Sequence, residues 1–109
     1  MLVFEVTEGE MMAALERLAR EQGVANGAIV SLIGGVKDFV VSTMPADDES
    51  QDVVTRYPMS AEMHGCGEIR EGKVHVHATM AIQGDRGVAG HVHSATVETH
   101  FVRAYVLAL

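Results

Sequence analysis

The chain has 109 residues and a formal net charge of −7, because 15 acidic residues outnumber 8 lysines and arginines. The basic residues are scattered, which disfavours nucleic acid and anionic membrane surfaces as partners, since both rely on clustered positive charge. Hydrophobic residues make up 48% of the sequence, as expected for one globular domain over residues 1–109. Tryptophan is absent, and a small aliphatic core is easier to stabilise in an oligomer.

Cysteine usage and the first residues indicate a compartment. Cys66 is the only cysteine, so no internal disulfide can form, which suits a reducing cytoplasm. The N-terminal segment lacks a basic stretch and turns acidic at Glu5, unlike a signal peptide. No apolar run approaches the ~20 residues of a membrane-spanning helix. We therefore expect a cytoplasmic protein with no membrane partner.

The N-terminal part predicts a strand followed by a helix. Residues 2–6 are typical of a short strand, and residues 10–21 have the periodicity of an amphipathic helix. Thr7 and Glu10 have the spacing of a capping box, in which Thr7 would cap the helix. Gly23 is expected to end the helix.

The next segment predicts strands around one polar loop. Residues 27–43 read as one long strand or two, broken at Gly34-Gly35. Paired glycines in a strand indicate a bulge or a place where another backbone comes close. Residues 44–53 are acidic and predict a surface loop, and weaker strand candidates at residues 59–64 and 68–70 flank the sequence GCG.

The clearest strand covers residues 73–82. Apolar residues at the even positions alternate with His75 and His77, so these histidines should face away from the core. Residues 83–87 predict a turn, and residues 95–109 are again rich in strand-forming residues. One helix after the first strand, followed mostly by strands, predicts a two-layer α+β fold.

Four of the six histidines form two His-x-His pairs, His75 with His77 and His91 with His93. Alternate residues of a strand project from one face about 6.5–7 Å apart, so His75 and His77 can converge on one ion. His91 would add a third ligand if the turn folds the chain back. Three neutral imidazoles with one open position are typical of catalytic or anion-binding metal sites. The spacing alone leaves open that these histidines are ordinary surface or interface residues.

The other reactive residues fit ordinary structural roles better. His64, His93 and His100 are consistent with surface histidines. Cys66 could bind a soft metal as a thiolate, but a lone cysteine is more often a small buried hydrophobic residue. Neither a nucleophile elbow nor a phosphate-binding loop occurs in the sequence.

Three segments resemble the PPC domain (plants and prokaryotes conserved). The sequence SLIGGVKD is similar to the family's S-x-I-G-A-V-x-D strand, and CGEIREGKVHVHATM to its S-G-x-I-x-x-G-x-P-H-x-H-x-S segment. The sequence AGHVHSATV is similar to the family's G-G-H-L-x-x-G-x-V. The resemblance covers nearly the whole chain. It implies a mostly antiparallel sheet with one main helix packed on it, assembled as a homotrimer.

The resemblance also separates the histidines. His75, His77 and His91 match the family's three recurrent histidines, which implies a metal-binding cluster near a subunit interface that holds a divalent ion, with zinc expected. Ala89 replaces a glycine of the family pattern. Arg103 stands where a strand glutamate is common, so any role of that glutamate would be missing here.

Two functions follow from these patterns. The first is a homotrimeric metal-binding protein or metalloenzyme, with an open metal position for water or a small anionic ligand. Its candidate general bases are Glu62, Glu68 and Glu98. The second is a DNA-associated or protein-interaction scaffold trimer without catalytic activity. Plant relatives contact DNA through an AT-hook, and this sequence has no R-G-R-P hook, so we do not expect nucleic acid as a partner.

Overall fold

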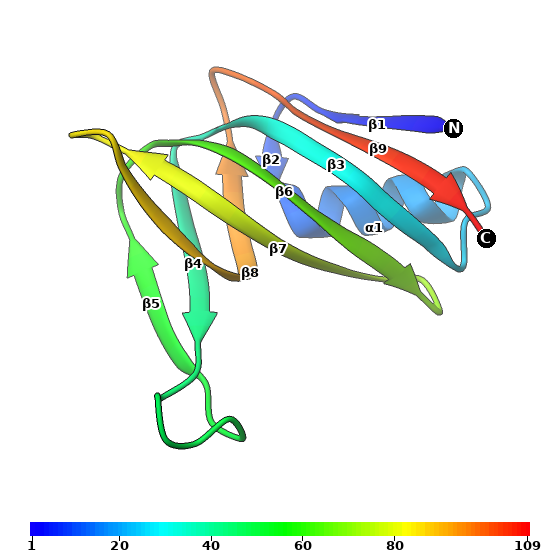
Figure 1. Cartoon of the computed structure of the whole chain (residues 1–109). Helices are drawn as coiled ribbons and strands as arrows, with labels where there is room; N and C mark the ends of the chain where they lie inside the picture. The colour runs from blue at the N-terminus through cyan, green and yellow to red at the C-terminus, as the bar shows by residue number, and fades with distance from the viewer.

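The computed structural model describes all 109 residues, which form one helix and nine strands (Figure 1). In chain order the elements are β1 (Leu2–Val6), β2 (Gly9–Glu10), α1 (Met11–Glu21), β3 (Gly27–Val36), β4 (Asp38–Thr43), β5 (Val53–Tyr57), β6 (Ala61–Arg70), β7 (Lys73–Ile82), β8 (Arg86–Val97) and β9 (Val102–Ala108).

All nine strands belong to one sheet, and every pairing in it is antiparallel. The strand order is β1-β9-β3-β6-β7-β8-β4-β5, and the short β2 pairs with β8. The helix α1 lies against one face of this sheet, and the β4–β5 hairpin extends away from the rest of the molecule (Figure 1). The predicted two-layer α+β fold with one main helix is confirmed. The helix α1 lacks the length and apolar character needed to cross a membrane.

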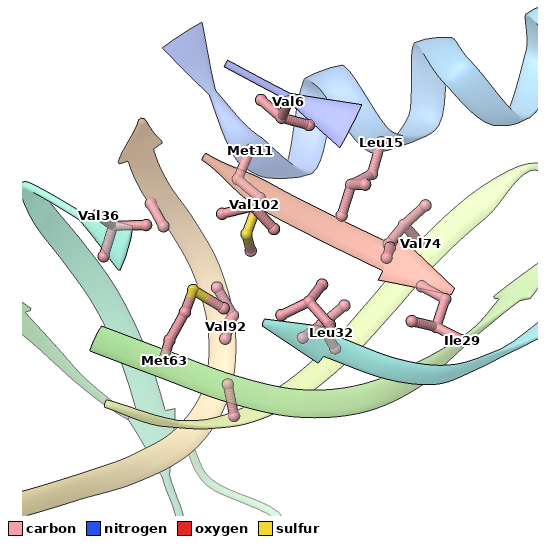
Figure 2. Close-up of a cluster of buried hydrophobic side chains, with 14 of the residues drawn as sticks. Val6, Met11, Leu15, Ile29, Leu32, Val36, Met63, Val74, Val92 and Val102 are labelled. Carbon is pink, nitrogen blue, oxygen red and sulfur yellow. The ribbon is translucent and has the colours of Figure 1, made fainter. Parts of the chain in front are cut away.

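The core fills the space between α1 and the sheet. The helix contributes Met11, Leu15 and Ala19, all fully buried. Met11 and Leu15 point toward the sheet, where Leu32 and Val102 are among the residues that meet them (Figure 2). Burial of these aliphatic side chains provides the main driving force for docking the helix, at roughly 25 cal/mol per Å² of apolar surface.

The carboxylate of Glu10 caps the helix. Its oxygens accept hydrogen bonds from the backbone N–H groups of Met12, at 2.8 Å, and Ala13, at 2.9 Å. A further N–H, that of Ala95 on β8, donates to Glu10 Oε2 at 3.1 Å. The predicted capping box with Thr7 as the cap is therefore wrong. The pairing of β2 with β8 places Glu10 itself at the helix start.

The predicted end of the helix at Gly23 is confirmed. Gly23 has a φ of +71°, a conformation that glycine adopts without a Cβ clash. Its N–H donates to the Arg20 carbonyl at 3.1 Å, and the Val24 N–H donates to the Ala19 carbonyl at 2.8 Å. This pair of bonds is the Schellman arrangement, which satisfies carbonyls left free at a helix end.

The strand does not break at Gly34-Gly35, because β3 continues through both glycines and the chain leaves it only at Lys37. The pairing register of β3 shifts between Ile29 and Leu32, so the irregularity also lies away from the glycines. Gly34 instead marks a close approach, because a Cβ there would overlap the Phe101 carbonyl oxygen. Of the two roles expected for the glycine pair, close approach of another backbone is the one observed.

The two weak strand candidates around the sequence GCG form a single strand, β6. Its glycines are required by the neighbouring strand β7. A Cβ on Gly65 would overlap the carbonyl oxygen of His77, and a Cβ on Gly67 would overlap that of His75. The close fit of β6 against β7 therefore involves the backbone of both histidines.

Candidate metal centre

Two histidines of the predicted site project from β7 on the face opposite the core. Val74 and Val76 are buried. His75, which lies between them, and His77, which follows Val76, are exposed. This is the alternation expected of a strand with one face on the core and one face free. The prediction that His75 and His77 share the outer face is confirmed.

The third histidine arrives from β8. A tight turn after β7, with Gly84 at φ +87° and Asp85 at φ +59°, reverses the chain. The register then places His91 directly opposite His77. Because side chains of directly opposed residues lie on the same face, His91 joins the other two histidines.

The three side chains form one compact group, called the histidine cluster from here on and defined as His75, His77 and His91. One ring nitrogen from each lies within 4.8 Å of the others. The Nε2 atoms of His75 and His77 are 3.1 Å apart. The structure thus brings together the residues that the sequence selected.

The surroundings of His91 favour its neutral imidazole. Burial lowers the pKa of His91 below its ordinary value of 6.5, and the neighbouring His75, His93 and His77 lower it further. The carboxylate of Asp52 acts in the opposite direction. A neutral imidazole presents a free lone pair, which is the form that binds a metal ion. Three convergent imidazole nitrogens are a donor set that fits Zn²⁺ and similar divalent ions.

Glu68 is the candidate carboxylate that lies beside the cluster. Its Oε2 atom is 3.5 Å from Nδ1 of His75, on the opposite side of the ring from the nitrogen that faces His77. Glu98 instead forms an ion pair with Lys37. A carboxylate at the far nitrogen of an imidazole orients the ring and fixes its tautomer.

The remaining imidazoles take other positions. His93 contacts the ring of His91 with 4.9 Å between ring centroids, and its Nε2 atom lies 2.9 Å from Ser42 Oγ. His64 is exposed on β6, and His100 is exposed between β8 and β9, as expected. His93 is thus a neighbour of the cluster that is already bonded elsewhere.

Cys66 is exposed, so the expectation of a buried cysteine is wrong. It lies opposite His77 in the β6–β7 register and therefore shares the outer face with the cluster.

Arg103, the departure from the family pattern, lies on β9. Its Nε atom donates to Glu5 Oε2 at 2.7 Å and its guanidinium lies 4.0 Å above the Phe101 ring, so it is committed to contacts away from the cluster.

A hollow of about 830 Å³ adjoins the cluster, and the sequence did not predict it. Strands β6, β7 and β8 supply its floor, and the loop end of the β4–β5 hairpin supplies one wall. It is lined by Ser42, Thr43, Met44, Asp52, His64, Gly65, Cys66, His77, Ala78, Thr79, Ala89, Gly90 and His91. The only sequence signal for it is the small size of the residues around His77 and His91.

Comparison with known families identifies the chain. The model of the Plants and Prokaryotes Conserved (PCC) domain matches residues 1–109. The chain belongs to the PCC domain family. It is the same family, also abbreviated PPC, that the three sequence motifs resemble. A comparison with curated proteins gave no match.

Solved structures share the PCC fold. A PPC protein from Pyrococcus horikoshii has a TM-score of 0.81 at 16% identity, over 99% of this chain and 79% of its own. A protein from Ralstonia eutropha JMP134, described as a candidate DNA-binding protein, has a TM-score of 0.79 at 23% identity, over 99% and 76%. A metal-containing protein from Archaeoglobus fulgidus has a TM-score of 0.75 at 19% identity, over 98% and 79%. At these identities the likeness establishes the fold.

Proposed function

We propose that this PCC-domain chain is a homotrimeric metal-binding protein that holds a divalent ion, preferably zinc, through His75, His77 and His91. The observation that carries the proposal is the convergence of three imidazole nitrogens from two strands within 4.8 Å. The lowered pKa of His91 supports it, because that ring is available to a metal at neutral pH. The metal-containing relative from Archaeoglobus fulgidus has the same fold, which agrees with the proposal.

The chemistry of such a site depends on its open position. Bound Zn²⁺ supplies Lewis acidity and lowers the pKa of water toward about 7. The residues of this chain orient the donors: Glu68 lies by Nδ1 of His75, which leaves Nε2 of that ring for the ion. A small anionic ligand fits the open position, and a hydrolytic, hydration or lyase reaction is the enzymatic form of the proposal.

The metal proposal is tested by a competition titration. Protein produced without a histidine tag is stripped with a chelator and titrated with Zn²⁺ against a chromophoric chelator. We expect stoichiometric uptake by the wild type and by His100→Ala, and loss of uptake in the His75→Ala/His77→Ala double variant. Equal uptake by the double variant and the wild type would refute the site.

Assembly with further copies of the chain is supported by exposed apolar side chains on neighbouring strands, and a homotrimer is the assembly that the family resemblance implies. Val30 and Ile33 of β3 are 54% and 51% exposed, and Leu107 of the adjacent β9 is 45% exposed. Exposed aliphatic residues of this size favour cover by another subunit. Light scattering should give three times the 11.7 kDa mass of one chain, and a monomeric mass would contradict the trimer.

The exposed free thiol of Cys66 is consistent with a cytoplasmic protein.

A DNA-associated or protein-interaction scaffold is the second candidate, because the Ralstonia relative is described as a candidate DNA-binding protein. The net charge of −7 per chain disfavours it, since the summed field of three subunits would repel phosphates. We expect no gel shift with duplex DNA at about 150 mM salt, where weak electrostatic binding is screened. A stable shift under these conditions would favour the scaffold function over the metal-dependent one.

A further inference from the structure

The hollow beside the histidine cluster is placed to receive the body of a ligand. It shares His77 and His91 with the cluster, and its volume of about 830 Å³ lies in the range of pockets for small molecules. Thr79 and Ala89 lie opposite each other on neighbouring strands. This pair lies two residues along the strands from the His77–His91 pair. A molecule held at the cluster would therefore extend about 6.5–7 Å along the strands to reach Thr79 and Ala89.

The charges of the lining restrict the ligand. No lysine or arginine lines the hollow, and Asp52 is its only carboxylate. Phosphate esters are normally held by basic side chains or clustered backbone N–H groups at a helix terminus, and strands whose N–H groups pair within a sheet offer neither. The lining also has no phenylalanine, tyrosine or tryptophan ring on which a nucleotide base would stack. Sugar phosphates and nucleotides are therefore poor candidates.

The apolar and small residues of the lining favour a neutral ligand body. Met44 and Ala89 offer apolar surface, and Thr43 and Thr79 add hydroxyl groups. Any negative charge away from the cluster would meet Asp52 without a cation to balance it, which disfavours a second carboxylate. Within one chain, positive charge for one anionic group would come from an ion in the cluster.

We propose, building on the metal site above, that the hollow binds a small monocarboxylic acid with an uncharged body. Its carboxylate lies at the histidine cluster, and its body lies over Thr79 and Ala89. Asp52 is the specificity residue that excludes dicarboxylates. Ala89 is assigned a role toward the ligand alone, whereas the carboxylate of Asp52 also raises the pKa of His91, so the Co²⁺ affinity of Asp52→Asn is measured beside its ligand response.

The experiment uses Co²⁺ in place of Zn²⁺, because the visible spectrum of Co²⁺ reports both its uptake and a change in its ligands. Butyrate and succinate are the probes, since they have the same number of carbons and differ in one carboxylate. We expect butyrate to change the spectrum of the loaded protein at concentrations about tenfold lower than succinate does. Asp52→Asn should reduce this difference to about twofold or less.

The matched pair Ala89→Leu and Ala81→Leu tests the location. Both alanines are exposed in the sheet, and only Ala89 lines the hollow. We expect Ala89→Leu to weaken butyrate binding about tenfold with unchanged Co²⁺ affinity, and Ala81→Leu to have no effect.

The outcomes separate this inference from the proposed function. Failure of the wild type to bind Co²⁺ would overturn the metal site and this inference with it. Normal Co²⁺ uptake with no response to butyrate, or with an equal response to succinate, would overturn the monocarboxylate inference and leave the metal site intact. An equal effect of the two leucine variants would place the ligand outside the hollow and overturn the inference as well.

Discussion

The Nε2 atoms of His75 and His77 lie 3.1 Å apart on the exposed face of β7. At this distance one of the two nitrogens can donate a hydrogen bond to the other. A divalent ion can take the place of this hydrogen bond and interact with both lone pairs at once. The pair is therefore arranged to accept a cation, and His91 completes the set from the neighbouring strand.

His91 and His93 offer a direct test of which imidazoles bind the metal. They lie two residues apart on β8 with their rings in contact, yet only His91 belongs to the cluster. We expect His91→Asn to weaken Zn²⁺ binding about 100-fold or more, because a ligand is lost. His93→Asn should weaken it less than about tenfold, since His93 is bonded to Ser42. A reversed order in a chelator competition assay would show that the ligand set is wrong.

The lowered pKa of His91 predicts how the metal-free protein responds to acid. Between the folded-state pKa and the ordinary value of 6.5, the folded protein binds fewer protons at His91 than the unfolded chain. The contribution of this group to stability is therefore present above 6.5 and is lost as the pH falls through the lower, folded-state pKa.

Thermal unfolding in the presence of a chelator measures this effect. We expect the melting temperature of the wild type to fall from about pH 7.5 to about pH 5.5 by more than that of His91→Asn. Equal decreases for the two proteins would contradict the assignment to His91.

Gly67 tests whether the strand spacing positions the cluster. A Cβ at Gly67 would overlap the carbonyl oxygen of His75, and a Cβ at Gly34 would overlap that of Phe101, which is outside the cluster. Gly67→Ala and Gly34→Ala should therefore both lower the melting temperature. Only Gly67→Ala should also weaken Zn²⁺ binding, by about tenfold, because it displaces the backbone of a ligand. Equal Zn²⁺ affinities of the two variants would show that Gly67 has no positioning role.

Glu10 should contribute strongly to docking the helix. It accepts two N–H groups of the first helical turn and one from Ala95 on β8. We expect Glu10→Ala to reduce the free energy of unfolding by about 2 kcal/mol, because a cap and a link to the sheet are lost together. Glu8→Ala is the control, since Glu8 is exposed. Similar values for the two variants in urea denaturation would contradict this role.

Strand periodicity explains why part of the site could be predicted. The alternation over residues 73–82 places His75 and His77 on the outer face whatever lies next to β7. The pairing of His91 with His77 could be anticipated only conditionally, because a shift of one residue in the register would turn His91 toward the core. The resemblance to family motifs selected His91 over His93, and the geometry agrees.

The errors have physical causes as well. The sequence GCG shows no clear alternation, so the continuous strand β6 and the outward position of Cys66 could not be recognised. The sequence predicts the helix cap at Thr7 because the pairing of β2 with β8, a long-range contact, leaves no local signal. The hollow also depends on long-range structure, since residues of the β4–β5 hairpin, including Met44 and Asp52, form one wall of it.

The most direct test of the central claim is the metal content of the protein as isolated. The protein is purified without a histidine tag and without chelators, and its metals are measured by elemental analysis. We expect about one equivalent of zinc or a similar divalent metal per chain in the wild type, and almost none in His75→Ala/His77→Ala. A wild-type protein without stoichiometric metal, and with no thermal shift when Zn²⁺ is added, would contradict the account.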